Sequence, residues 1–170
     1  MTEPRQKPGK SRQDFETPDE FIRAVEQRFG RLSCDLAAND DLGGPGANHK
    51  APLWWGPGQD ALVQDWTRLA GNLWLNPPFG QIPRWAAKCA ASAGDGRRII
   101  MLSPASIGTN WFADHVHGRA LVLALNPRIT FVGESHPYPK DLMITVWGPK
   151  SWIGLDVWRW RPLRGPTPWP

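Results

Sequence analysis

The apolar residues of this chain follow two spacings, one helical and one extended, and together they predict an α/β sheet. Apolar side chains recur at helical intervals between Phe21 and Phe29, with Pro18 before them and Gly30 after them as start and stop signals. Two further helices are expected at 82–93 and around 111–112. Short apolar runs predict strands at 32–36, 73–76, 98–103, 121–125, 129–132 and 142–147. Strands alternating with helices place a site at the carboxyl edge of the sheet.

One region is too short for a full doubly wound sheet. Residues 41–60 are rich in Gly, Pro and Asn and are expected to form a long loop. Roughly 40 residues separate Asp35 from Asn76, whereas two βαβ units of about 30 residues each would be needed there. The sequence therefore predicts a trimmed doubly wound sheet in a single domain at 14–157. A basic flexible tail is expected at 1–13, and a tail rich in Arg, Trp and Pro at 158–170.

Composition narrows the classes of protein to consider. With 170 residues and 41% hydrophobic content, the chain fits one globular domain with a core. Its start does not resemble a signal peptide and no apolar run is long enough to span a bilayer, so a cytoplasmic protein, not a membrane protein, is expected. Cys34 and Cys89 are interpreted as reduced core residues, and the pair His115 and His117 as ordinary polar residues, with no metal expected.

The charge distribution allows a polyanionic partner. The net charge is +4 and the isoelectric point is near 9.4. At the C-terminus, Arg159 and Arg161 alternate with Trp158 and Trp160, a pattern that can bind phosphates and stack on bases. The same pattern also fits a final strand that packs its indoles on the domain, and the sequence leaves both interpretations open.

The most informative segment is Asn76-Pro77-Pro78-Phe79, which directly follows the apolar run 73–75. The two prolines have no backbone N–H, so this turn presents carbonyl oxygens without competing donors. The Asn76 side-chain oxygen and a proline carbonyl can accept both hydrogens of an exocyclic amino group, while Phe79 can stack on the ring that carries it. This arrangement suits methyl transfer to a planar amine, and a plain turn is the alternative.

Three other segments can serve a bound adenosyl amino acid. An acid at a strand end followed by small residues can hold an ammonium group or hydroxyls while the backbone approaches the ligand. A second acid can meet an adenine amine or ribose hydroxyls, and a ring and hydroxyl at a helix start can meet a carboxylate. These segments are Asp35 with Ala37 and Ala38, then Asp60, and Phe15 with Thr17 and Pro18. Each also has an ordinary reading as a strand-end cap, a solvated acid or a helix N-cap.

Taken in order, these segments resemble the phage-type DNA N6-adenine methyltransferases, the phage Dam family. The resemblance runs from Phe15 to about Trp147. It rests on the segments 15–18, 34–38, 60–66, 76–79, 103–112 and 128–131. It implies a Rossmann-like fold, S-adenosylmethionine as methyl donor, adenine in double-stranded DNA as acceptor, and a phage or prophage protein in a bacterial host cell.

The resemblance also assigns roles to residues. It implies that Asp35, Ala37, Asp60 and Asn76 line the cofactor site, which Phe15, Thr17 and Pro18 close, and that residues 76–79 carry the chemistry on a flipped-out base. Candidate DNA contacts are Phe79, Thr109, Trp111, Arg128, Arg159 and Arg161. Thr109 and Trp111 are expected to border the base pocket, and Arg128 to contact a phosphate or base edge. Many relatives have tyrosine where this chain has Phe79, and the Trp-rich C-terminus has no counterpart in the family pattern.

Other functions fit the same residues. The chain can be a methyltransferase for another planar amine, such as an RNA base or a protein glutamine, although those enzymes usually carry a glycine-rich turn that the segment 35–38 lacks. It can also be a non-catalytic DNA-binding module on the same fold. A nucleotide-binding protein of other chemistry is disfavoured, because the P-loop and G-x-G-x-x-G motifs are missing. A monomer is favoured, and the recognition sequence cannot be read from the chain.

Overall fold

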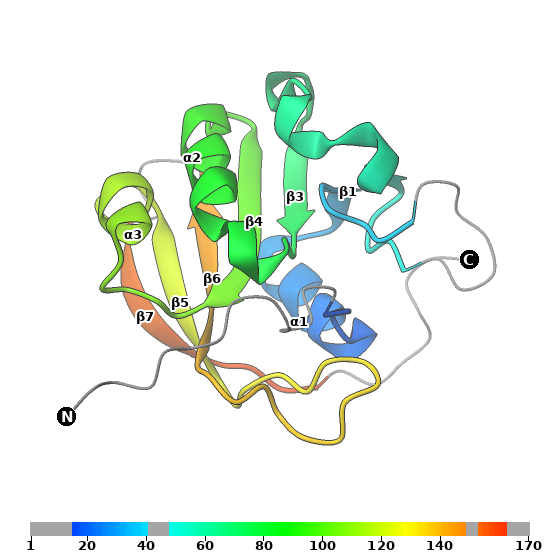
Figure 1. Cartoon of the computed structure of the whole chain (residues 1–170), viewed down its shortest axis with the longest axis vertical. Helices are drawn as coiled ribbons and strands as arrows, with labels where there is room; N and C mark the ends of the chain where they lie inside the picture. Colours follow the sequence, from blue (N-terminus) through cyan, green and yellow to red (C-terminus); the bar gives the residue numbers. More distant parts are fainter. Residues whose placement is uncertain (1–14, 41–47, 149–152, 163–170) are drawn as a thin grey trace.

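The computed structural model describes residues 15–40, 48–148 and 153–162, and these form an α/β sheet. The strands are β1 Leu32–Asp35, β2 Leu53–Trp54, β3 Gly71–Leu75, β4 Arg97–Pro104, β5 Leu121–Asn126, β6 Leu142–Trp147 and β7 Gly154–Arg159. Their order across the sheet is β2-β1-β3-β4-β6-β5-β7 (Figure 1). Strand β6 runs antiparallel to both β4 and β5, and the other neighbouring pairs are parallel.

Helices cover both faces of this sheet (Figure 1). Helix α1 (Asp19–Phe29) packs on one face, while α2 (Ile82–Ser92) and α3 (Asn110–His115) pack on the other. Gly30 ends α1 with a φ of 92°, a conformation that glycine adopts without steric cost. The protein therefore has the three layers of a Rossmann-like fold, as the sequence predicted.

Alternation along the central strands builds the two cores. In β3, Trp74 faces α1, whereas Leu73 and Leu75 face α2. In β4, Ile100 faces α1 and Met101 faces the opposite layer. All five of these side chains are at most 1% exposed. Central strands covered on both sides are expected to be apolar at every position, and this is why the strands predicted here as continuous apolar runs were found correctly.

The chain reverses direction across the sheet between β1 and β3. From β1 the chain continues to β2 on one side, and from β3 it continues to β4 on the other. The carboxyl ends of β1 and β3 therefore border a topological switch point, where ligands bind in open α/β sheets. Asp35 ends β1 and Asn76 follows β3, so both candidate site residues lie at this crevice.

The region between β1 and β3 is trimmed, as predicted, although it is not all loop. It contains the short strand β2 and three single-turn 3-10 helices at Pro57–Gln59, Ala61–Val63 and Trp66–Arg68. Within its described residues it holds no α-helix. Residues 41–47 lie outside the described part of the chain.

The predicted strand at 129–132 is wrong. This segment belongs to the connection between β5 and β6 and pairs with no strand of the described chain, yet Ile129 and Phe131 are at most 2% exposed. Burial without pairing produced the misleading pattern, because alternating apolar side chains of a buried loop resemble those of a strand.

The predicted tail boundary after residue 157 falls inside β7, which extends to Arg159. Trp158 and Trp160 are 8% and 5% exposed and belong to the core under α1. The Phe21 ring lies 5.7 Å from Trp158 and 4.8 Å from Trp160, between ring centroids. Trp160 Nε1 also donates to the Pro127 carbonyl at 2.7 Å. Of the two interpretations left open, the structure therefore has the strand that packs its indoles.

The predicted N-terminal tail at 1–13 and residues 163–170 lie outside the described residues.

The two cysteines are free and buried, as expected for reduced core residues. Burial, followed by the neighbouring Asp35 carboxylate, raises the pKa of Cys34 to about 12, and burial raises the pKa of Cys89 well above its usual value. Both thiols therefore stay protonated. No helix in the described ranges is long and apolar enough to cross a membrane.

Candidate functional site

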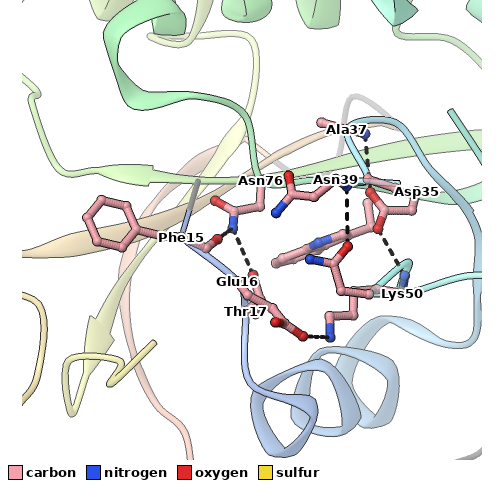
Figure 2. Close-up of a pocket in the computed structure, with 11 residues that line it drawn as sticks. Phe15, Glu16, Thr17, Asp35, Ala37, Asn39, Lys50 and Asn76 are labelled. Carbon is pink, nitrogen blue, oxygen red and sulfur yellow. Dashed lines mark hydrogen bonds and ion pairs between the residues drawn. The ribbon is translucent and has the colours of Figure 1, made fainter. Parts of the chain in front are cut away.

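The Asn76 amide has one orientation that its neighbours enforce. Its Nδ2 donates to the Phe15 carbonyl at 2.6 Å and to the Thr17 hydroxyl at 3.0 Å (Figure 2). A carbonyl oxygen can only accept, so the amide nitrogen must face it. The Asn76 Oδ1 accepts no hydrogen bond from the described residues and is not enclosed by protein. The side chain therefore presents a pre-oriented acceptor at the end of β3.

The segment 15–18 that holds this amide is itself tied to two other parts of the domain. Lys50 Nζ forms ion pairs with Glu16 at 3.2 Å and with Asp19 at 2.9 Å. On the other side, the backbone N–H of Val132 donates to the Glu16 carbonyl at 3.0 Å. The N-terminal segment thus crosses the switch point and connects the loop after β1 with the loop after β5.

Asp35 organises the loop after β1. Its two carboxylate oxygens accept from the backbone N–H groups of Lys50 at 2.9 Å and Ala37 at 3.2 Å. The side chain is 3% exposed, and this burial raises the pKa of Asp35 to about 6, although the two backbone hydrogen bonds and the nearby Lys50 charge act in the opposite direction. Asp35 therefore changes its charge close to neutral pH, and it lines a pocket where a ligand cation would favour its ionised form.

This pKa gives a testable pH dependence of stability. Between about pH 4 and pH 6 the folded protein holds a proton on Asp35 that the unfolded chain releases, so the contribution of Asp35 to the free energy of unfolding falls as the pH rises through that window. The loss approaches roughly 3 kcal/mol above pH 6, at about 1.4 kcal/mol for each pH unit. In Asp35→Asn we expect a smaller decrease, measured by urea unfolding at pH 4.5 and pH 7.5. Parallel pH profiles for the two proteins would contradict this assignment.

Two adjoining pockets open at the crevice. One has a volume of about 250 Å³, and apolar side chains form much of its wall, among them Leu36, Trp55 and Trp85. The other holds only about 20 Å³ and is polar, with Asp35, Glu16 and Lys50 around it. Both are lined by Phe15, Ala37, Ala38, Asn39 and Asn76. A ligand with a large planar part and a small charged end matches this shape.

Two features of the larger pocket point to a bound ligand. The indole N–H of Trp85 lies in a side chain that is 6% exposed, and it has no hydrogen-bond partner among the described residues. Asp60 sits at the pocket with a φ of 38°, the one positive φ among the non-glycine residues that the structure describes. Its carboxylate accepts from the Leu62 N–H at 3.2 Å. Unpaired buried donors and strained backbone are both features that concentrate at functional sites.

The other three residues of the turn 76–79 have different surroundings. Pro78 lines the larger pocket, and its carbonyl already accepts from the Gln81 N–H at 3.0 Å. The Pro77 carbonyl is therefore the other candidate for the second acceptor beside Asn76, although Pro77 is buried and lines neither pocket. Phe79 is half-buried and packs against Phe15 with 5.8 Å between ring centroids, so part of its surface is already covered by protein.

Several predicted site residues do not line the two pockets. Pro18 is the N-cap residue before α1, and its carbonyl accepts from the backbone N–H groups of Phe21 and Ile22. Thr109 bonds the Ser106 carbonyl before α3, and Trp111 packs against the core beneath α2 and α3. Arg128 donates to the carbonyls of Tyr138 and Pro139, while Arg159 and Arg161 are exposed at the end of β7.

Sequence reasoning missed several residues that shape the site. They are Glu16, Asn39, Asn48, Lys50, Trp55, Trp85, Phe131 and Tyr138. Lys50 stands in a loop rich in Gly, Pro and Asn without any periodic pattern, so its burial could not be anticipated. The helical pattern placed Trp85 on the buried side of its helix correctly. Only the structure shows that no described residue accepts a hydrogen bond from its N–H.

The chain is similar in sequence to one described protein family and to one phage protein, and it matches one solved structure in part. The family model described as DNA N-6-adenine-methyltransferase (Dam) matches residues 5–142. A protein named DNA N-6-adenine-methyltransferase from Escherichia phage T1 is 25% identical over 127 residues, which cover 75% of this chain and 50% of that protein. The chain thus spans about half the length of this relative. Among solved structures, a predicted O-methyltransferase, protein Atu636 from Agrobacterium tumefaciens, matches with a TM-score of 0.31 and 16% identity, over 51% of this chain and 40% of the other.

Proposed function

Because the chain belongs to the DNA N-6-adenine-methyltransferase (Dam) family, we propose that it transfers a methyl group from S-adenosylmethionine to the N6 amine of adenine in double-stranded DNA. The acceptor base would have to leave the helix stack to reach the crevice, at a cost of a few kcal/mol. The relative from Escherichia phage T1 supports a phage or prophage protein that acts on DNA inside the host cell.

The observation that carries this proposal is the fixed Asn76 amide. Its nitrogen is held by Phe15 and Thr17, and its oxygen is free to accept at the junction of the pocket and the aromatic side chains. An exocyclic amine that donates to Asn76 Oδ1 and to the Pro77 carbonyl has its two hydrogens fixed. Its lone pair then turns out of the ring plane, toward the side on which the pocket lies.

The pocket residues fit S-adenosylmethionine. The cofactor supplies an electrophilic methyl on a sulfonium when bound. The apolar walls with Trp55 and Trp85 suit an adenosine. Asp35 can face the ammonium group. Small side chains at Ala37 and Ala38 allow close approach of the backbone where other nucleotide sites use glycine.

The protein contributes positioning more than acid–base chemistry. Holding the amine and the methyl donor on two sides of Asn76 makes the transfer effectively unimolecular. The methylated nitrogen becomes acidic and can lose its proton to water, so a general base is not required. The absence of a histidine from the lining of the two pockets therefore agrees with the proposal.

The decisive experiment is a transfer assay with methyl-labelled S-adenosylmethionine on unmethylated duplex DNA, followed by nucleoside analysis. We expect label in N6-methyladenine. Parallel reactions with RNA and with protein extract test the other planar amines. Label in RNA or in glutamine, with none in DNA, would mean that the acceptor is an RNA base or a protein glutamine instead of adenine in DNA. Cofactor binding without any methyl transfer would support the non-catalytic DNA-binding module.

A cofactor-site variant gives an independent check. Ala37→Leu places a larger side chain in the space shared by the two pockets. We expect the affinity for S-adenosylhomocysteine to fall at least about tenfold, since a steric conflict of this kind costs ~1–3 kcal/mol. Calorimetry measures the affinity. Ala113→Leu, on the exposed side of α3, is the matched control and should bind as the wild type does. Equal affinities for the two variants would mean that the ligand binds elsewhere.

The proposed DNA contacts remain the exposed guanidinium groups of Arg159 and Arg161, together with Arg128. Arg128 already donates to two backbone carbonyls, at 3.4 Å and 2.8 Å, through one nitrogen. Its other N–H groups are available for a phosphate. Contacts of this kind position a duplex and weaken as salt rises.

A further inference from the structure

Beside Asn76 lies a cluster of four aromatic rings, formed by Phe15, Phe79, Phe131 and Tyr138. Every pair of these rings has a centroid distance between 5.0 and 6.2 Å. Phe131 is 2% exposed, while the other three are half-buried. The four-ring cluster therefore has a buried floor and a partly exposed rim.

The four-ring cluster and the pocket lie on two sides of the same amide. Asn76 bonds the Phe15 backbone, and the Phe15 ring extends away from Asp35 and Ala37, which stand on the other side (Figure 2). Phe79 follows Asn76 by three residues and packs on this ring. A planar acceptor held by the Asn76 oxygen from the side of the cluster thus has aromatic surface to rest on, with the methyl donor opposite.

No ring can be inserted into the cluster as it stands. A base sandwiched between two rings needs about 7 Å between them, since each stacked layer takes ~3.5 Å. The described distances are all shorter, so a base can be sandwiched here only if one rim ring turns. Phe131 is buried, and the backbone of Phe15 holds Asn76. Tyr138 is the rim ring that comes from a separate surface connection, between β5 and β6.

Hydrogen bonds fix the backbone around Tyr138, whereas its ring lies at the partly exposed rim of the four-ring cluster. The Tyr138 N–H donates to the Ile129 carbonyl at 2.8 Å, and Arg128 donates to the Tyr138 carbonyl at 3.4 Å and to the Pro139 carbonyl at 2.8 Å. The Tyr138 ring lies 5.6 Å from Phe79, edge to face at 78°. A rotation of the side chain alone can convert this contact into a stacking surface.

We propose that Tyr138 is a binding residue for the acceptor base, and that its ring turns to pack against the adenine that Asn76 holds. The inference rests on the proposed function and extends it to a second ring from a distant part of the chain. The ring, not the hydroxyl, carries the contact. Phe79 therefore shares the stacking of the base, and the connection between β5 and β6 becomes part of the acceptor site.

Two variants separate the ring from the hydroxyl. The probe is a short duplex with one bulged, unpaired adenine, and the reference is the same duplex without the bulge. In Tyr138→Ala we expect the affinity for the bulged duplex to fall about tenfold, within the range typical for loss of one base-stacking ring. Tyr138→Phe should stay within about twofold of the wild type. Affinity for the fully paired duplex and for S-adenosylhomocysteine should be unchanged in both, and circular dichroism checks the fold.

A second readout follows the ring directly. Tyr138 is the only tyrosine of the chain, so incorporation of 3-fluorotyrosine gives one ¹⁹F resonance. We expect this resonance to shift with the bulged duplex and to stay in place with the paired one. An unmoved resonance at saturating bulged DNA, or equal losses in Tyr138→Ala and Tyr138→Phe, would overturn the inference. If the wild type methylates adenine while these results are negative, the proposed function stands and only the role of Tyr138 falls.

Discussion

Asn76→Ala should lower the rate of methyl transfer at least about 100-fold, a loss typical of removing a positioned transition-state hydrogen bond. The oxygen of this amide matters most as the amine nitrogen leaves the ring plane, so the loss should fall mainly on kcat. Cofactor affinity should fall much less than the rate, because Asn76 borders the larger pocket but its other walls remain. The measurement is single-turnover methylation of unmethylated duplex DNA, with calorimetry of S-adenosylhomocysteine binding alongside.

Two further variants make this prediction specific. Thr17→Val removes one of the two acceptors that orient the amide and leaves the Phe15 carbonyl, so an intermediate loss of rate is expected. Gln27→Ala, on the exposed side of α1, removes another side-chain amide away from the site and should leave the rate unchanged. A wild-type rate for Asn76→Ala would show that the turn 76–79 is only a turn, and the proposed chemistry would fall with it.

Trp158→Ala and Trp160→Ala should each lower the free energy of unfolding by about 3–5 kcal/mol, the usual effect of truncating a buried large aromatic side chain. Both indoles pack on Phe21 of α1, and the Trp160 indole N–H also donates to the Pro127 carbonyl. This loss is a large fraction of the stability of an ordinary domain, so the double variant is expected not to fold. Urea unfolding measures the single variants.

The same strand supplies a matched control. Val157 directly precedes Trp158, on the other face of β7, and is 55% exposed. Val157→Ala should therefore change the free energy of unfolding by no more than about 0.5 kcal/mol. If Trp158→Ala keeps wild-type stability but loses DNA affinity, the indoles serve the nucleic acid instead of the core, the other interpretation that the Arg and Trp pattern allows.

Local sequence patterns were sufficient to predict the main helices and central strands and to propose the centre of the candidate site. Apolar periodicity was sufficient for α1, α2 and the central strands, because these elements bury regular faces. The turn 76–79 was proposed as the centre of the site from residue types alone, since two prolines and an amide after a buried strand suit the binding of an amino group, with a plain turn as the alternative. The placement of Asp35 and Asn76 at one edge followed from the rule that parallel strands end together.

Tertiary structure decided everything that depends on contacts between distant segments. The orientation of Asn76 comes from Phe15 and Thr17, about 60 positions away along the chain. The burial of Lys50 comes from a loop that no periodicity describes, and its charge is balanced by Glu16 and Asp19. Such pairings leave no trace in local sequence, because each partner on its own is an ordinary polar residue.

The wrongly predicted strand and the C-terminal segment whose interpretation was left open have the same physical origin. Residues 129–132 have the apolar pattern of a strand but form a buried loop, and residues 158–160 have the composition of a nucleic-acid-binding tail but lie in the sheet and core. Sequence by itself determined which side chains prefer to be buried and which can carry chemistry. The fold decided which neighbours bury them, and in doing so it brought Phe131 and Tyr138 beside Phe79, an aromatic surface that only the long connection between β5 and β6 can supply.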